Sequence, residues 1–342
     1  MTRTQWFPLL PGWLLLAALA VIAGILEGQV EFGGKHPLEA PVIAILLGIL
    51  LRNTIGLPAR VVSGVKAFEK PLIVGIVLIG AKLDLSLLTS HGENLILIIL
   101  LTMVTGLASI VVVGRVLKLS GALSVLLAVG TTICGGTAIA VTAPLIRARE
   151  EETSYAIATI ALCGLAAILV YPALGRFLGI GDFHFGAFVG TAIHSTPQVV
   201  GAGFIYSDKA GEVATAVKLV RNCFLAPAAF MVALWFAGVS DPATGEAPSL
   251  RGRFSQIAKG FPWFLFGFFV MAGLGSAGYF TPKGASGFSD AGKFLILLGM
   301  AGIGLNTQFA ALRSIGFRPF IVGVVGTLVV AAVSAGLIFW LL

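Results

Sequence analysis

The stretches Gly130-Thr-Thr-Ile-Cys-Gly-Gly-Thr137 and Gly190-Thr-Ala-Ile-His-Ser-Thr-Pro-Gln198 each interrupt an apolar segment with polar residues, glycines or a proline. They resemble each other at an offset of 60 residues, and the matching residues are Val129, Gly130, Thr131 and Ile133 with Val189, Gly190, Thr191 and Ile193. Irregular backbone at membrane depth is tolerated only where it is buried in protein or lines a watery cavity. A duplicated, broken apolar segment is therefore typical of a transporter's substrate site.

The composition of the whole chain is that of an integral membrane protein. Of its 342 residues, 58% are hydrophobic and 11% are charged, and the mean hydropathy is +1.02. Such a chain cannot cover itself with polar surface. The net charge of +7 comes from basic residues scattered in short loops, which favours a topology signal over nucleic-acid binding. We expect a single polytopic domain over 1–342.

Hydropathy divides the chain into eleven apolar segments. They lie near 9–26, 38–51, 71–88, 94–114, 122–146, 154–172, 185–206, 213–237, 261–280, 292–311 and 319–342. The first is expected to be a retained helix, with a cleaved signal peptide as the alternative. The predicted fold is an all-α integral membrane protein with about 9–11 transmembrane segments and two broken or re-entrant elements in an inverted-repeat transporter core. Core elements are expected around 71–172 and 185–237/292–342, and the remaining helices form a panel or scaffold.

The distribution of lysine and arginine predicts the topology. If all eleven segments cross, thirteen basic residues fall on one side and seven on the other, which places the N-terminus in the cytoplasm of a bacterial inner-membrane protein. Both broken segments would then run in the same direction, whereas inverted repeats need them opposed. Re-entrant hairpins with tips at Gly135-Gly136 and Ser195-Thr196-Pro197 would approach from opposite faces and change the count to fourteen against six. The sequence leaves both alternatives open.

The first broken segment offers an anion-binding backbone. Candidate substrate-binding residues are Thr132, Cys134, Gly135, Gly136 and Thr137. Glycines at the start of a half-helix leave free N–H groups and the positive end of the helix dipole facing a ligand. The alternative is that the glycines serve tight helix packing.

The second broken segment adds side chains that can bind or carry a proton. Its candidates are His194, Ser195, Thr196 and Gln198, beside Pro197, which must break or kink the helix. His194 is the coupling candidate because imidazole titrates near neutral pH. The alternative is a neutral histidine that is hydrogen-bonded within the bundle.

Two cations lie in a later apolar segment. Lys218 and Arg221 are three residues apart and share one helix face. Ionisable residues at membrane depth tend to line substrate or ion paths, so both are candidates for binding an anion, with snorkelling to the interface as the alternative. Asn306 and Thr307 are secondary candidates for neutral hydrogen bonds, or merely cap a helix end. No metal site, cofactor or disulfide is expected from the three dispersed cysteines.

The combination of these motifs is similar to a known family. Gly130-Thr-Thr-Ile-Cys-Gly-Gly-Thr-Ala-Ile139, Ile193-His-Ser-Thr-Pro-Gln-Val-Val200 and Val217-Lys-Leu-Val-Arg221 resemble the YeiH-like membrane proteins, which are labelled sulfate exporters and grouped with the cation/proton antiporter and bile-acid symporter superfamily. The resemblance covers essentially the whole chain. It implies a core with two broken elements meeting at mid-membrane, a flanking panel, often a homodimer, and elevator-like alternating access. Ser195 departs from the pattern, since many members carry an acidic residue there.

The expected function is secondary active transport, in the export direction, of a small inorganic or sulfur-containing anion such as sulfate or sulfite. The protein would act in a lipid bilayer, with a proton or sodium as a candidate coupling ion. The alternatives are a proton- or sodium-coupled carrier of an organic acid anion and an anion channel. An enzyme is not expected, because no HExxH or GxSxG motif occurs, and no GxxxxGK[ST] loop indicates primary transport.

Overall fold

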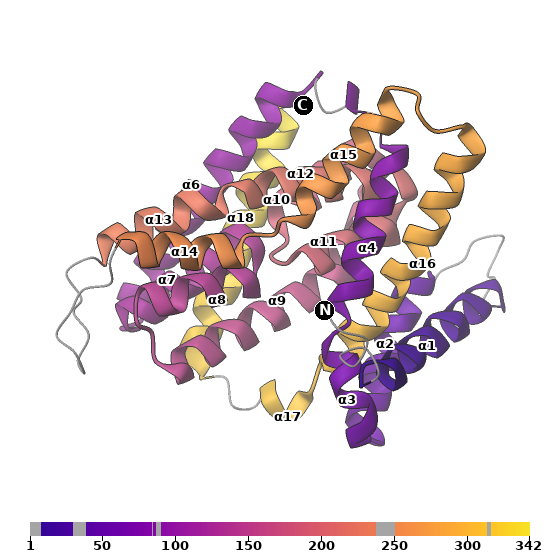
Figure 1. The fold of residues 1–342 in the computed structure, drawn as a ribbon. Helices are drawn as coiled ribbons and strands as arrows, with labels where there is room; N and C mark the ends of the chain where they lie inside the picture. Colours follow the sequence, from indigo (N-terminus) through magenta and orange to yellow (C-terminus); the bar gives the residue numbers. More distant parts are fainter. Residues whose placement is uncertain (1–7, 30–38, 84, 87–89, 237–249, 313–315) are drawn as a thin grey trace.

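The computed structural model describes residues 8–29, 39–83, 85–86, 90–236, 250–312 and 316–342, and the described residues form helices without strands (Figure 1). The expectation of an all-α membrane protein is confirmed. The helices group into two bundles by their packing.

One group, which we call the panel bundle, joins the N-terminal helices to two late ones. It contains α1 (Leu10–Gln29), α2 (Ala40–Thr54), α3 (Ala59–Lys66), α4 (Glu69–Ile79), the short 3-10 turn η2 (Gly80–Lys82), α15 (Phe264–Ser276) and α16 (Pro282–Asn306). Glycines let its backbones approach closely: a Cβ on Gly75 of α4 would lie 2.7 Å from the carbonyl oxygen of Gly292 on α16. The packing therefore places α4 and α16, which the sequence grouping assigns to the core elements, with the N-terminal helices.

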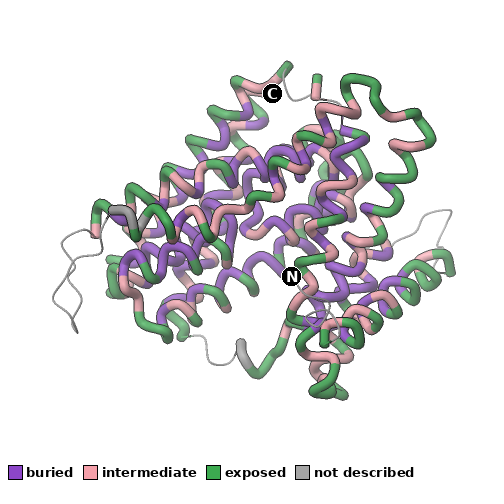
Figure 2. The backbone as a smooth tube through the Cα atoms, viewed as in Figure 1, coloured by how far each residue is buried: buried purple, intermediate pink, exposed green. Residues whose placement is uncertain are grey.

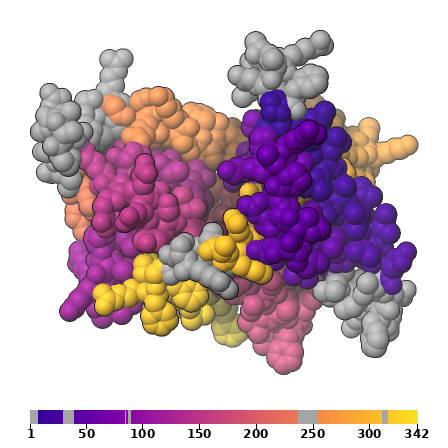
Figure 3. All heavy atoms as spheres, turned by 90° about the horizontal axis from the view of Figure 1, so that it is seen from below, coloured from indigo at the N-terminus to yellow at the C-terminus, as the bar shows by residue number. Residues whose placement is uncertain are grey.

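The other group, the hairpin bundle, holds both broken segments. It contains α6 (Gly92–Val116), α7 (Gly121–Val129), η3 (Gly130–Cys134), α8 (Gly136–Leu145), α9 (Glu150–Phe177), α10 (Asp182–Ala192), α11 (Thr196–Tyr206), α12 (Asp208–Cys223), α13 (Leu225–Trp235), α14 (Leu250–Gly260) and α18 (Phe317–Leu341). The short α17 (Phe309–Leu312) connects α16 to α18 and contacts α9. Figure 3 shows the indigo panel helices on one side of the molecule and the magenta helices of the hairpin bundle on the other.

Six helical segments of the described chain are long and apolar enough to cross a membrane: Leu10–Gln29, Gly92–Val116, Glu150–Phe177, Asp208–Trp235, Pro282–Asn306 and Phe317–Leu341. A pair bent by 53°, Phe254–Gly260 with Phe264–Ser276, makes a seventh if it is one span. The other four predicted segments correspond to α2, to α4 and to the two broken elements. Their helices are 15 residues or shorter, which accounts for the difference from the predicted 9–11. The outer ends of three predicted segments, at residues 38, 88 and 237, lie outside the described residues.

The first broken element returns to the end of the molecule at which it starts. Ser120 caps α7 by accepting a hydrogen bond of 3.1 Å from the amide of Leu123. The same hydroxyl donates to the carboxylate of Glu152 in the first turn of α9. Only residues 146–149 separate α8 from α9. The start of α7 and the end of α8 therefore lie together, and residues 121–145 form a re-entrant hairpin.

The second broken element returns in the same way at the opposite end of α9. Phe185 of α10 stacks on Tyr206, the last residue of α11, with ring centroids 3.8 Å apart. The Tyr206 hydroxyl donates 3.4 Å to the carbonyl of Gly175 near the end of α9. Residues 182–206 thus form a second hairpin. The two hairpins enter from opposite ends of α9, which answers the question that the sequence left open. Figure 2 shows their buried residues in the middle of the molecule.

Candidate functional site

The tip of the first hairpin is a π-helical turn that ends at a glycine. The amide of Gly135 donates 3.0 Å to the carbonyl of Gly130, five residues back. Gly135 has φ +70° and ψ −130°, a conformation that glycine adopts without penalty and that other residues avoid. The turn redirects the chain, so that α8 begins afresh at Gly136. π-Turns of this kind are frequent at functional sites.

The tip of the second hairpin is extended backbone followed by a new helix. Ile193 has ψ 150° and Ser195 has φ −95° and ψ 151°. Pro197 lies in the first turn of α11, where its missing N–H would have no helical partner in any case. The Gln198 side chain accepts a 3.3 Å hydrogen bond from the amide of Ser195 and donates 3.2 Å to the carbonyl of Ala161 on α9. The residues that stop α10 therefore also start α11.

The two tips meet. A Cβ built on Gly135 would lie 2.9 Å from the Cβ of Ser195 and 3.1 Å from its Cα. Such a contact is closer than carbon atoms normally approach, so this meeting requires glycine at position 135 on grounds of space as well as backbone conformation. Two stretches 60 residues apart in sequence thus form one junction.

Lys218 fastens this junction from α12. Its side chain is fully buried, and its Nζ donates to the carbonyl oxygens of Ile133 at 2.8 Å and Ile193 at 2.9 Å. A third hydrogen bond goes to the carbonyl of His194. An ammonium group has three donors, so all of them are used by the backbone of the two tips.

Arg221 makes a second set of backbone contacts, one helical turn further along α12. It is 1% exposed. Its Nε donates 2.6 Å to the carbonyl of Thr132 and its Nη2 donates 2.9 Å to that of Thr131. Its Nη1 donates 2.6 Å to the carbonyl of Thr191 and 3.1 Å to that of Ile193. In the described part of the chain neither cation forms a salt bridge. Their positive charges lie at the carbonyl ends of both half-helices, where the helix dipole is negative.

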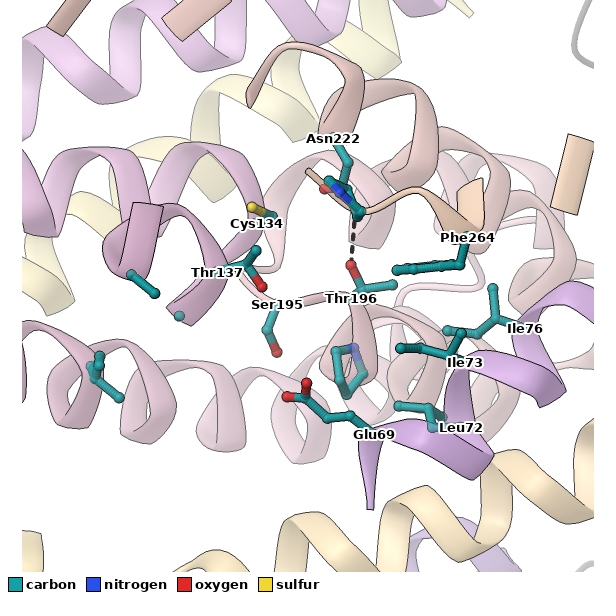
Figure 4. Close-up of a pocket in the computed structure, with 15 residues that line it drawn as sticks. Glu69, Leu72, Ile73, Ile76, Cys134, Thr137, Ser195, Thr196, Asn222 and Phe264 are labelled. Carbon is teal, nitrogen blue, oxygen red and sulfur yellow. Dashed lines mark hydrogen bonds between the residues drawn. The ribbon is translucent and has the colours of Figure 1, made fainter. Parts of the chain in front are cut away.

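A cavity of about 420 Å³ lies between the hairpin tips and the panel bundle. Figure 4 shows its lining. Of the residues predicted to bind substrate, the lining contains Cys134, Gly136, Thr137, Ser195 and Thr196. The panel side contributes Leu72, Ile73, Ile76 and Phe264. The cavity therefore has a polar wall made by the tips and a largely apolar wall opposite.

Two polar lining residues were missed by the sequence reasoning. Asn222 donates 3.0 Å from Nδ2 to the hydroxyl of Thr196, and its position next to Arg221 was a signal that could have found it. Glu69 is the first residue of α4 and lines the cavity from the panel side. Nothing in the local sequence distinguishes it from an ordinary residue at the start of an apolar helix.

The remaining candidates lie outside the lining. Thr132 donates 2.7 Å to the carbonyl of Ala128. His194 is fully buried and its Nε2 lies 2.9 Å from the hydroxyl of Thr327 on α18. Gly135, Gln198, Lys218 and Arg221 form the junction behind the cavity. This arrangement of His194 is the internally hydrogen-bonded alternative, and its role in coupling stays a prediction.

Asn306 and Thr307 line a different cavity of about 340 Å³, between α9 and the end of α16. Asn306 donates 3.1 Å to the carbonyl of Val65 and 2.8 Å to that of Gly302, and Thr307 donates 2.9 Å to that of Ile303. Both side chains thus donate hydrogen bonds to backbone carbonyls near the ends of helices. Ile157 lines both cavities, so the two spaces are neighbours along α9.

The orientation of the half-helices gives the cavity at the hairpin tips its electrostatic character. The N-termini of α8 and α11 lie at the cavity. The first N–H groups of a helix have no internal partner and its N-terminal end carries partial positive charge. The carbonyl ends of η3 and α10, which would attract cations, are already held by Lys218 and Arg221. Chemically, the tip wall therefore favours oxygen atoms of an anion.

Comparison with known proteins identifies similar chains. The family model described as "Conserved hypothetical protein 698" matches residues 11–323. A UPF0324 membrane protein from Oceanobacillus iheyensis is 32% identical over 325 residues, which cover 94% of this chain and 92% of the relative. Another from Agrobacterium fabrum is 33% identical over 341 residues, with 98% and 94% covered. One from Pseudomonas aeruginosa is 32% identical over 326 residues, with 92% and 89% covered.

Proposed function

The chain belongs to the family of conserved hypothetical protein 698, together with the UPF0324 membrane proteins, and from this premise we propose that it is a secondary active transporter for a small inorganic or sulfur-containing anion. It is a multi-pass membrane protein. The substrate class is that of sulfate and sulfite, and the direction is export. The setting is a bacterial inner membrane with the N-terminus in the cytoplasm. The resemblance to the YeiH-like exporters agrees with this proposal.

The observation that supports the proposal most is the meeting of two oppositely directed hairpin tips at one cavity between two bundles. A substrate held at such a place lies near the middle of the molecule, where access from either side depends on how the bundles sit against each other. The Gly136 and Thr137 amides and the Ser195 and Thr196 hydroxyls supply hydrogen-bond donors to anion oxygens.

Lys218 and Arg221 contribute to this site indirectly. The sequence predicts that they contact the anion, whereas all three donors of Lys218 and four of the five donors of Arg221 are bonded to backbone carbonyls. Their charges cancel the negative ends of η3 and α10 and leave the positive ends of α8 and α11 uncancelled. The anion thus meets an excess of positive potential without a direct salt bridge. Binding without such a bridge suits a carrier, because the substrate must also be released.

Alternating access would come from movement of the hairpin bundle along the panel bundle. Their contact is apolar where α11 packs on α16: a Cβ on Gly201 would lie 2.5 Å from the sulfur of Met300. Two ion pairs also cross between the bundles, Arg176 with Glu39 and Lys293 with Asp208, and the movement would have to break them. Partly exposed pairs of this kind contribute only about 0–1 kcal/mol each. This agrees with an elevator-like carrier, and a homodimer would anchor the panel bundles.

Transport into proteoliposomes tests the proposal. Purified protein is reconstituted and uptake of radiolabelled sulfate, sulfite and a panel of carboxylates is measured, together with Thr137→Val, whose hydroxyl lines the cavity. The matched control is Thr105→Val on α6, an exposed residue whose hydroxyl donates to its own helix. Losing a hydrogen bond to a charged ligand costs about 1.5–3 kcal/mol, so affinity should fall by roughly tenfold to a hundredfold.

The outcomes separate the alternatives. Uptake of sulfate or sulfite that is weakened in Thr137→Val and unchanged in Thr105→Val supports the proposal. Transport of carboxylates alone supports an organic acid carrier. Anion currents above carrier turnover that need no counter-ion support a channel. If the reconstituted protein moves none of these anions, the proposed function is wrong.

A further inference from the structure

Glu69 places a carboxyl group in the cavity from the side opposite the hairpin junction. It begins α4 in the panel bundle and lines the same space as Thr137, Ser195 and Thr196. Figure 4 shows its carboxyl oxygens turned toward the hydroxyl of Ser195. Among the described lining residues it is the single carboxyl group.

Unlike three other acidic groups of the described chain, this carboxyl has no ion-pair partner. Glu39 is paired with Arg176, Glu152 with Arg149, and Asp208 with Lys293. Within the described residues, Glu69 makes neither a hydrogen bond nor an ion pair. Its own helix continues with Leu72, Ile73 and Ile76 along the cavity wall. Glu69 is exposed to the cavity and has no cation partner among the described residues, so a proton can neutralise its charge there.

The charged and titratable groups that face Glu69 are few. From the first hairpin it faces the Cys134 thiol, with Lys218 and Arg221 behind the tip and bonded to backbone carbonyls. From α11 and α12 it faces the neutral Thr196 and Asn222. In the cavity lining, α9 and α15 contribute only apolar residues, such as Ile157 and Phe264.

The positive ends of α8 and α11 attract any anion in the cavity, and the Glu69 carboxylate is one. When a substrate anion occupies that place, an ionised Glu69 would face a like charge in a space of about 420 Å³. A protonated Glu69 has no such repulsion and can donate a hydrogen bond to the anion. Binding of the anion and protonation of Glu69 should therefore favour each other.

We propose that Glu69 is the proton-coupling group of this cavity, so that each anion binds and crosses together with one proton on Glu69. The proposal rests on the proposed transport function and names the coupling ion of the same site. It moves the coupling role from His194, which contacts Thr327 outside the lining. A monovalent anion would cross without net charge, and a divalent one would carry a single negative charge. An acidic cytoplasm would accelerate efflux of the anion, because it favours the protonated form of Glu69.

The test measures anion binding and proton movement together. For the wild type, we expect sulfate or sulfite affinity to fall about tenfold per pH unit in alkaline buffers, which is the slope of one linked proton. The Glu69→Gln side chain is permanently neutral. At every pH, the anion affinity of this variant should therefore equal the affinity that the wild type has at acid pH. In vesicles containing a pH dye, wild-type uptake should acidify the lumen and Glu69→Gln should take up anion without acidification. The matched control, Glu93→Gln, changes an exposed carboxylate in the first turn of α6 and should behave as wild type.

The results distinguish failure of the inference from failure of the proposed function. If the wild type binds neither sulfate nor sulfite, the function itself is wrong. If it binds them and Glu69→Gln keeps the wild-type pH slope, or if sodium replaces the proton in wild-type coupling, the role of Glu69 is wrong and the function stands. Thermal unfolding of each variant checks folding. Glu69→Asp, which keeps a carboxyl group, should retain the pH slope and provides the second variant.

Discussion

Replacing Lys218 by methionine should unfold the hairpin junction rather than simply weaken anion binding. Methionine has nearly the same length and remains apolar, so the change removes the ammonium group with little loss of volume. The ammonium donates to three buried carbonyl oxygens, of Ile133, Ile193 and His194. A buried acceptor left without its donor costs about 1–3 kcal/mol.

The expected loss for Lys218→Met is therefore at least about 2 kcal/mol of unfolding free energy, since the carbonyls of Ile133 and His194 lose their donor and each contributes about 1 kcal/mol or more. The carbonyl of Ile193 keeps its hydrogen bond from Arg221. Lys209→Met is the matched control because Lys209 lies exposed in the first turn of the same helix. Surface substitutions of that kind usually change stability by no more than about 0.5 kcal/mol.

The assay is equilibrium unfolding of both variants and the wild type in the same detergent, followed by circular dichroism and by the denaturant midpoint. A denaturant midpoint for Lys218→Met well below that of Lys209→Met agrees with a structural role for Lys218, in which it holds the two tips together through their backbone carbonyls. Equal midpoints, together with loss of sulfate binding in Lys218→Met alone, would refute the reasoning and return Lys218 to direct contact with the anion.

Further variants test the geometry of the tips and the role of His194. Gly135→Ala forces a side chain into a positive-φ conformation that only glycine readily adopts, at a cost of about 1–3 kcal/mol, and into the Ser195 contact. Gly136→Ala meets open space and should change stability by no more than about 1 kcal/mol, in the stabilising direction. Thermal unfolding of the pair checks this, and equal unfolding temperatures would argue against tip contact. His194→Gln should lose about 1 kcal/mol with its Thr327 hydrogen bond and keep the wild-type pH profile of transport; a flattened profile in the vesicle assay would instead make His194 the coupling group.

The sequence was most informative where local chemistry determines the backbone. Gly135 and Pro197 marked both breaks, because a positive φ and a missing N–H leave few alternatives. The 60-residue repeat indicated that the breaks belong together. It could not decide between spanning and re-entrant segments, because that depends on contacts such as Ser120 with Glu152, which join residues on different elements.

The sequence was least informative about what buried charges contact. On charge alone, Lys218 and Arg221 were predicted to bind an anion, although their hydrogen-bond acceptors are backbone carbonyls of residues 24 to 90 positions away in the sequence. Backbone carbonyls carry no signature in a sequence. Glu69 was missed for a related reason, since only the packing of α4 against the hairpin tips brings it to the cavity.

The matching positions of the repeat also have a physical explanation that the sequence alone did not give. Ala158 and Ala161 stand in the first copy where Lys218 and Arg221 stand in the second. The carbonyl of Ala161 accepts from Gln198, and a Cβ on the nearby Gly164 would overlap the Gln198 side chain at 1.9 Å. Small residues on α9 therefore leave room for the second hairpin tip, whereas the cations on α12 hydrogen-bond to the backbone of both tips.

The central claim is that both hairpin tips face one anion in one cavity, and cysteine protection tests it most directly. In a variant without Cys134, Cys163 and Cys223, single cysteines at Thr137 and at Ser195 are labelled with a small thiol reagent at increasing sulfate or sulfite concentration. If the tips share one site, both positions are labelled and the same half-maximal concentration of anion protects both. Protection of only one position, or at clearly different concentrations, would contradict a shared site.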